Sequence, residues 1–474
     1  MFSTVLTQEI KGLAGNRTWW GIIGLLILLT VLAAANGAAR FEQMAEVTAR
    51  LNQDEATLQQ GMKAGAARYE ASPAGDPPSV TSPGNVGLSI LGHYAVQQFG
   101  PLAALSVGQS DVQPSYYRVT AQPAHTFLNA SEIQNPVTQV LGSFDAAFVF
   151  IFVLPILIIA VSFDLMSREK EGGTLGLVAA QGVRLRSLIL AKISARAWMI
   201  LAVLLVLVFV AGAIVGADIT APSVIIQLLA LFAVVAAYAF FWFALGLLIN
   251  AFNWPSVTNG VVLANIWLIF VVVLPSFVNV AATMLYPAPS RVALTTEMRE
   301  ATEEADKEAA SARDAYLFDH PELAGAGANP DDFYLQVLAT NAAVEKAIEP
   351  ILDQFAQQAQ SRERVVGLLQ YTSPAIAAQE ALNALAGTGN RRFADFTQQV
   401  LEFHERWSGF FVSRIIKGQR MKAADFDAIP GFAYVAPPDS EARNAAVGPL
   451  AFMVIGFVVL TLWAARRYAR YPVV

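Results

Sequence analysis

The residues best suited to act on a partner lie in one polar stretch, 162–196, between two apolar runs. It opens with acidic residues and closes with basic ones: Asp164, Glu169, Glu171, Arg184, Arg186, Lys192 and Arg196. Such side chains form ion pairs with a complementary surface. Between them, Gly172 and Gly173 end one helix and Thr174 can cap the next. We therefore expect a short helix over 174–180 that docks in a groove on a partner and passes its movement to both apolar runs.

No sequence motif for catalysis or nucleotide binding accompanies this stretch. The chain has no phosphate-binding G-x-x-x-x-G-K-[ST] loop and no recognisable spacing of a nucleophile and a base. It contains no cysteine, and its four histidines lie far apart in the sequence. Thiolate sites are therefore excluded, and we expect no metal site. We expect this chain to be no enzyme and to hold no cofactor of its own.

The composition indicates a membrane protein with large water-exposed parts. Of 474 residues, 55% are hydrophobic and only 14% are charged, which is too apolar for an ordinary soluble chain. A helix needs about 20 mostly apolar residues to cross a bilayer. Six runs fit this requirement and are expected to be transmembrane helices, at 19–37, 139–163, 197–215, 223–249, 257–285 and 447–466.

The basic residues predict the orientation of these runs. With the N-terminus inside, the cytoplasmic segments would hold eleven Lys and Arg against four acidic residues, as the positive-inside rule requires. Both termini are then cytoplasmic, as are an amphipathic surface helix at 1–18, the loop at 164–196 and the tail at 467–474. The inserts at 38–138 and 286–446 are extracytoplasmic. A cleaved signal peptide at the first run and a disordered N-terminal tail are the alternatives.

The two inserts are expected to form a mainly helical domain. Apolar residues continue at helical spacing beyond the first run, up to Ser72-Pro73. A charged, Ala-rich helix is predicted near 295–316, a second around 344–355, and a third with an aromatic face from Phe393 to Ile415. The stretch 86–135 supports no strand assignment. We expect an all-α polytopic membrane protein carrying this domain.

Polar and aromatic residues inside the runs are candidates for lining a pathway. They are Gln227, Trp242, Asn259, Asn265 and Trp267. An amide in hydrocarbon must find a partner, so it usually faces other helices or a cavity. Asn259 and Asn265 are six residues apart, which places them on roughly opposite sides of one helix. Interhelical hydrogen bonding without any ligand is the alternative.

The polar stretch resembles the coupling-helix loop of permease subunits of ATP-binding-cassette transporters, in the exporter-like ABC-2 class. The similarity lies in Glu169-Lys170-Glu171-Gly172-Gly173-Thr174-Leu175, in Gln181-Gly182-Val183-Arg184 and in Lys192. The N-terminal amphipathic helix and the order of six runs are also similar. More narrowly, the chain resembles a bacterial subgroup with two large extracytoplasmic inserts. This similarity lies at residues 108–114, 135–136, 142–145, 287–291, 319–322 and 373–374.

The resemblance implies a function in the bacterial inner membrane. A separate ATPase subunit, in two copies, would bind ATP and Mg and contact Glu169, Glu171, Gly172, Gly173, Thr174, Leu175, Arg184 and Arg186. The N-terminal helix and the turn around Asn253 and Trp254 would be further contacts. The other partners implied are a second permease half, identical or related, and membrane lipid; no nucleic acid is implied.

Two functions fit this expectation. In the first, the chain is a permease of the exporter kind that couples ATP hydrolysis in the partner to substrate movement. In the second, it is a mechanotransmitter that moves its extracytoplasmic domain to act on an envelope lipid, lipoprotein or partner protein. In both, Glu171→Arg is expected to weaken association with the ATPase or to uncouple hydrolysis.

Overall fold

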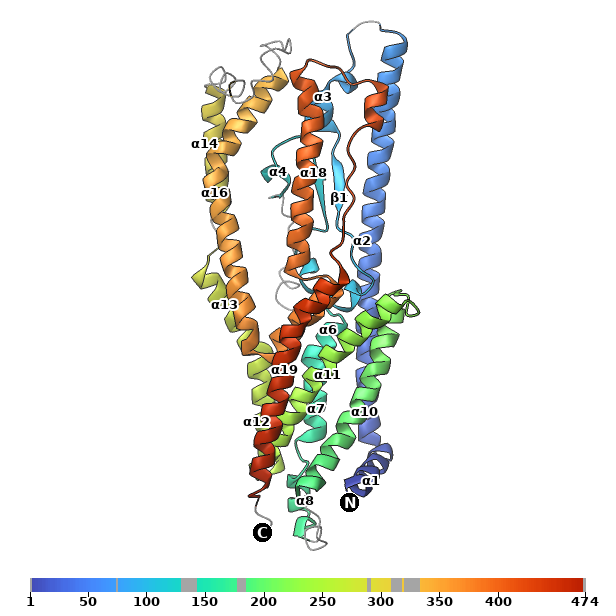
Figure 1. Cartoon of the computed structure of the whole chain (residues 1–474), viewed down its shortest axis with the longest axis vertical. Helices are drawn as coiled ribbons and strands as arrows, with labels where there is room; N and C mark the ends of the chain where they lie inside the picture. The colour runs from blue at the N-terminus through green and yellow to red at the C-terminus, as the bar shows by residue number, and fades with distance from the viewer. Residues whose placement is uncertain are drawn as a thin grey trace.

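The protein is an all-α multi-pass membrane protein, and its described residues include six helices long and apolar enough to span a bilayer. The computed structural model describes residues 2–73, 76–128, 143–176, 185–287, 291–307, 318 and 333–471. The spanning segments form a bundle at one end of an elongated molecule, and a large domain lies at the other (Figure 1). We call the far end of the bundle, which holds residues 164–176, the loop end.

The first span and the domain share one helix. Helix α1 (Phe2–Ala14) lies at the loop end, where Asn16 caps the following helix by accepting a hydrogen bond from the Thr18 amide. Helix α2 (Arg17–Ala71) then runs unbroken for 55 residues from the loop end into the large domain (Figure 1). It ends directly before Ser72-Pro73, as the sequence predicted, because proline disfavours a helical residue before it.

Helix α11 forms the middle of the bundle. Helices α10 (Leu185–Ile214) and α11 (Pro222–Asn250) make the hairpin that the short turn at 216–222 predicted. Helix α11 packs against α10, α19 (Asp439–Tyr468) and α7 (Leu154–Ser162). Its bulky side chains Tyr238 and Trp242 are fully buried between these helices.

Two spans are interrupted by π-helical turns. Span two consists of α6 (Ala146–Phe148), η5 (Val149–Val153) and α7, and span five of α12 (Ser256–Trp267), η6 (Leu268–Val273) and α13 (Leu274–Leu285). A proline, Pro155 or Pro275, follows each π turn by two residues. Proline has no N–H group, so it leaves a carbonyl of the preceding turn without its helical donor.

Side chains from other helices supply the missing donors. The Tyr238 hydroxyl donates to the Ile151 carbonyl at 3.0 Å, and the Ser373 hydroxyl donates to the Phe270 carbonyl at 2.5 Å. The Trp267 indole N–H also donates to the Phe152 carbonyl at 3.2 Å. Because a lipid environment offers no such donors, these three bonds make the broken spans compatible with a membrane.

The large domain is mainly helical, as predicted. Its long helices are the distal part of α2 and α14 (Arg291–Lys307), α16 (Phe333–Leu369), α17 (Pro374–Ala386) and α18 (Asn390–Ile416). Short elements fill the rest: η1 (Ser79–Thr81), α3 (Pro83–Asn85), η2 (Val86–Ile90), η3 (Ala103–Leu105), η4 (Gly108–Asp111), α4 (His125–Leu128), η8 (Gln370–Thr372) and η9 (Ala423–Asp427). The sequence did not predict the small antiparallel sheet of β1 (His93–Val96) and β2 (Tyr116–Val119).

The aromatic face of α18 forms the core of this domain. Phe396, Phe403, Trp407 and Phe411 are almost fully buried and recur at spacings of seven, four and four residues, so they share one side of the helix. The sheet and the distal part of α2 pack against the same cluster. This core is separate from the core of the bundle.

Several contacts join the domain to the bundle. Helix α17, rich in alanine, packs between α11 and α19. Arg40 on α2 forms an ion pair with Asp111, which also accepts a hydrogen bond from Ser143 at 2.5 Å. Asp145 directly precedes span two. Its carboxylate accepts a hydrogen bond from the Phe148 amide, which caps the span, and another from the Val107 amide, both at 2.7 Å. Burial raises the pKa of the Asp145 carboxyl to about 6, although these bonds oppose the shift.

Candidate functional site: the loop after span two

Short helical segments hold the loop at residues 164–176. Helix α7 ends at Ser162, a turn covers 163–166, and α8 (Ser167–Glu171) follows. Gly173 then has a φ of +70°, a left-handed conformation that favours glycine. Leu175 is only 3% exposed and packs into the bundle core, so the chain turns back toward the spans after the glycines. The segment predicted as a helix, 174–180, lies outside the described residues from 177 onward.

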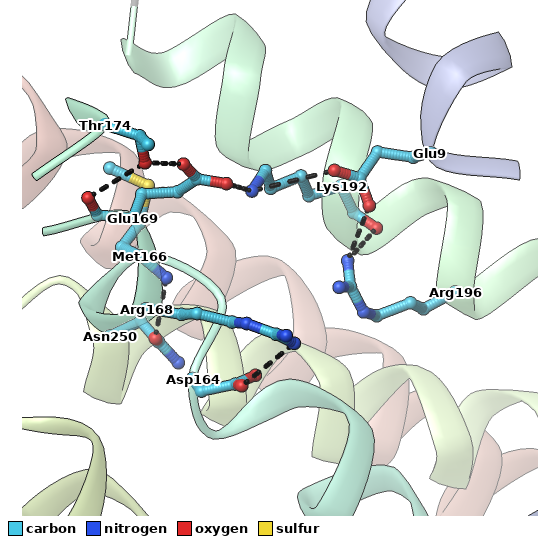
Figure 2. Close-up of polar contacts among 9 residues, drawn as sticks. All are labelled: Glu9, Asp164, Met166, Arg168, Glu169, Thr174, Lys192, Arg196 and Asn250. Atoms are coloured by element: carbon cyan, nitrogen blue, oxygen red, sulfur yellow. Dashed lines mark hydrogen bonds and ion pairs between the residues drawn. The ribbon is translucent and has the colours of Figure 1, made fainter. Parts of the chain in front are cut away.

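A chain of charges ties the loop to α1 and α10. Figure 2 shows Lys192 on α10 between two carboxylates, 2.5 Å from Glu169 and 3.6 Å from Glu9 on α1. Arg196, one turn further along α10, lies 3.3 Å from Glu9. Glu169 also accepts a hydrogen bond from the Thr174 hydroxyl. Lys192 is only 9% exposed, so solvent screens these interactions far less than those of a surface ion pair.

A second set of bonds ties the loop to the start of span five. The Glu171 carboxylate accepts from the Ser256 amide at 2.7 Å and from the Ser256 hydroxyl at 2.8 Å. It thereby caps the N-terminus of α12, where a negative charge is favourable. Lys170 donates to the side-chain oxygen of Asn253 at 2.9 Å, and Asn253 adopts a positive φ of 61° in the turn between α11 and α12.

Asn250 fixes the loop to the end of α11. Its side-chain oxygen accepts from the Met166 amide at 3.2 Å, as drawn in Figure 2. Its amide nitrogen donates to the Ser162 and Gly246 carbonyls, both at 2.8 Å. One buried side chain therefore satisfies the end of span two and the end of α11 together.

The outward surface of the loop is polar and exposed. Arg168, Lys170, Glu171, Gly172, Gly173 and Thr174 are all exposed. Arg168 is the least constrained, because its side chain is 79% exposed and pairs only loosely with Asp164, at 3.8 Å. Ion pairing and hydrogen bonding with a partner are the chemistry that this surface offers. In the part of the chain that the structure describes, no group of three His, Asp or Glu side chains could hold a metal ion.

The structure brings six of the eight residues expected to contact a partner into this loop. Glu169, Glu171, Gly172, Gly173, Thr174 and Leu175 lie within it, and the two acidic residues already have partners within the chain. Arg184 lies outside the described residues, as does the side chain of Arg186. Glu171, expected to be central, therefore also has a structural role at α12.

The five residues expected to line a pathway lie at different places. Asn259 is buried near the loop end, 3.4 Å from the Ser167 hydroxyl, whereas Asn265 is exposed and bonds the Val261 carbonyl of its own helix. Trp242 is buried within the bundle, and Trp267 bonds span two. Of the five, Gln227 lines the large cavity between bundle and domain.

Sequence reasoning missed the partners of the loop. Asn250 and Ser256 were not singled out, although an amide and a hydroxyl flanking a short turn between two apolar runs are a recognisable signal. The prolines of the broken spans were also missed as a pair. They lie in a repeated sequence, Val153-Leu154-Pro155 and Val273-Leu274-Pro275, which would have located both π turns.

The comparisons with known proteins concern the large domain. Residues 291–435 match a family described as a domain of unknown function, DUF3526. This segment contains helices α14, α16, α17 and α18, and it ends shortly before α19 begins. No curated protein matches the chain. The match therefore marks residues 291–435 of the large domain as a recurring unit and assigns no function.

Proposed function

We propose that this chain is the membrane subunit of an ATP-binding-cassette transporter of the exporter-like ABC-2 class. A separate ATPase subunit would dock on the loop at 164–176 from the cytoplasm and drive it by binding and hydrolysing ATP. The chain would then act as a permease in the bacterial inner membrane, in a complex with a second permease half.

One observation carries this proposal: the loop is bonded directly to three other elements and, through Lys192, to a fourth. Glu169 reaches α10 and, through Lys192, α1; Asn250 holds the end of α11; and Glu171 caps α12. A force applied to the exposed surface of the loop therefore reaches the ends of spans two to five without crossing a flexible connection. Such an arrangement suits an element that converts the movement of a partner into movement of the spans.

A mechanotransmitter is the second candidate, and helix α2 favours it. The helix is continuous from the loop end to the far part of the large domain. Near that far part, Lys63 pairs with Asp427 at 2.7 Å and Gln59 donates to the Phe426 carbonyl at 2.6 Å. Movement of α1 and the first span would thus displace the large domain, whether or not a substrate crosses the bundle.

Docking is tested by reversing the charge of Arg168. Arg168→Glu should reduce the amount of ATPase that co-purifies with the chain from its native membrane in mild detergent. Arg50→Glu is the matched control, because Arg50 is 78% exposed and also pairs with an acid one turn away, but it lies on the distal part of α2. Equal recovery of ATPase with both variants, or no ATPase with the unmodified chain, would refute docking at this loop.

Coupling is tested separately at Glu171. Glu171→Gln keeps the size of the side chain but removes the charge that caps α12. In a reconstituted complex we expect normal ATPase binding with weaker stimulation of hydrolysis by the membrane subunit. Unchanged stimulation would show that the bond to Ser256 does not transmit the movement.

A further inference from the structure

A large cavity lies between the bundle and the large domain among the described residues. Its volume is about 1650 Å³. Pockets for drug-sized ligands usually enclose roughly 300–1,000 Å³, so this cavity has room for a larger molecule. Its walls come from spans two and five, from α16, α17 and α18, and from the start of α19. These elements meet where the bundle ends and the domain begins (Figure 1).

The part of the wall within the bundle is mostly apolar. Its apolar residues lie at and beside the two π turns and are Phe148, Ile151, Phe152, Val271, Pro275 and Val278, whereas Gln227 and Asn279 are polar members of the same wall. The bonds that repair the broken spans involve carbonyls at this same level, from Ile151, Phe152 and Phe270. The apolar wall therefore exposes side chains and few unpaired backbone groups, and it suits hydrocarbon.

The part of the wall within the large domain is polar and carries both charges. Arg362, Arg391 and Arg392 line it, and so do Glu380, Asp439 and Glu441. Guanidinium groups and carboxylates therefore meet at one wall, and together they can pair with both charges of a zwitterion.

We propose that this cavity binds one glycerophospholipid with an amine-bearing headgroup. The acyl chains would lie against the π turns, and the headgroup would lie in the domain. Phosphate oxygens would accept from Arg392 and the neighbouring arginines, since guanidinium groups suit phosphate. The ammonium group would face the acidic side chains of the same wall. This inference is independent of the proposed ATPase coupling, because binding requires no ATPase.

Two glycines provide a test of the cavity and a matched control for it. Gly367 on α16 lines the cavity, and a Cβ added there meets no heavy atom within 4 Å. Gly61 on α2 also has open space around an added Cβ but lies outside the cavity wall. Gly367→Trp should therefore occupy the cavity without disturbing the backbone, whereas Gly61→Trp adds the same side chain elsewhere.

The experiment is native mass spectrometry of the purified, delipidated full chain with added lipid. Phosphatidylethanolamine should bind in one copy to the unmodified chain and to Gly61→Trp, and binding to Gly367→Trp should be lost. Diacylglycerol, which lacks the headgroup, and free phosphoethanolamine, which lacks the chains, should each bind at least tenfold more weakly. Monodisperse elution of both tryptophan variants confirms that they fold.

A second pair of variants tests the headgroup. Arg391→Leu removes an exposed guanidinium from the cavity wall and should weaken phosphatidylethanolamine binding about tenfold. Arg364→Leu, which removes an exposed arginine of α16 outside that wall, should leave binding unchanged. The proposal is overturned if no lipid binds, if both tryptophan variants bind it equally, or if diacylglycerol binds as well as the phospholipid.

Discussion

Replacement of Lys192 by methionine should loosen the loop at its connection to α1 and α10. Methionine is similar in length and apolar, so the substitution removes the charge with little loss of packing. Lys192 makes a 2.5 Å charge-assisted bond to Glu169 and a 3.6 Å ion pair to Glu9, and all three side chains are largely shielded from solvent. A hydrogen bond to a charged group contributes about 1.5–3 kcal/mol, and its loss here leaves two carboxylates facing each other.

The expected change is about 2 kcal/mol in the free energy of local opening, or roughly a thirtyfold increase in the open population. Hydrogen–deuterium exchange of the detergent-solubilised chain measures this directly. Uptake should rise in peptides covering 2–14 and 164–176 and remain unchanged in the large domain. Glu169→Gln should produce a similar rise, and the double variant should add less than the sum, because both changes break the same bond.

Lys63→Met is the control, because it removes another lysine that pairs with a carboxylate. Lys63 lies 2.7 Å from Asp427, but its side chain is 43% exposed and that of Asp427 is 66% exposed. An exposed pair contributes at most about 1 kcal/mol, so its local effect should be much smaller. If the two variants raise exchange around their own sites equally, burial does not strengthen the Lys192 network and the argument is wrong.

Three further predictions concern the remainder of the molecule. Gly37→Ala should lower the melting temperature of the purified chain, because a Cβ at Gly37 would overlap the Ala104 carbonyl where α2 meets η3. An unchanged melting temperature would show that the two elements can separate freely. Asp145→Asn should make stability less dependent on pH. The pKa of the Asp145 carboxyl is about 6 in the folded chain and 3.8 ordinarily, so proton binding stabilises the fold fully below about pH 4. This stabilisation, about 3 kcal/mol, is lost as the pH rises through 6. Parallel plots of melting temperature against pH for both proteins, from pH 4 to 7, would contradict this. Trp407→Ala should destabilise the large domain by about 3–5 kcal/mol, because the side chain is 1% exposed among Phe403 and Phe411, and proteolysis should then cleave α18 before any span.

Periodic features of the fold were predictable from the sequence. The six apolar segments, the extension of α2 to Ala71 and the aromatic face of α18 all follow from the spacing of apolar residues along one helix. The sheet was not predictable in this way. Its strands have four residues each and are separated in the sequence by η3, η4 and connecting loops, so neither shows a pattern long enough to recognise.

The candidate site was predictable in position but not in its bonds. The charged residues and the Gly-Gly-Thr turn located the loop, but the partner of each charge depends on which helix ends meet in three dimensions. Glu171 shows this most clearly, because its bond to Ser256 spans 85 residues of sequence. The π turns were missed because proline was interpreted singly, whereas its effect depends on donors from other helices, such as Tyr238 and Ser373.

The unbroken length of α2 gives the molecule a lever arm. At 1.5 Å per residue, its 55 residues extend over roughly 80 Å. A tilt of only about 5° around the end nearest α1 would move the opposite end by about 7 Å, a distance greater than one helical turn. A change of angle that is too small to open a wide passage between the spans therefore produces a large displacement at the tip of the domain. The contacts of Gln59 and Lys63 with η9 lie in the distal third of this arm, where displacement approaches its maximum.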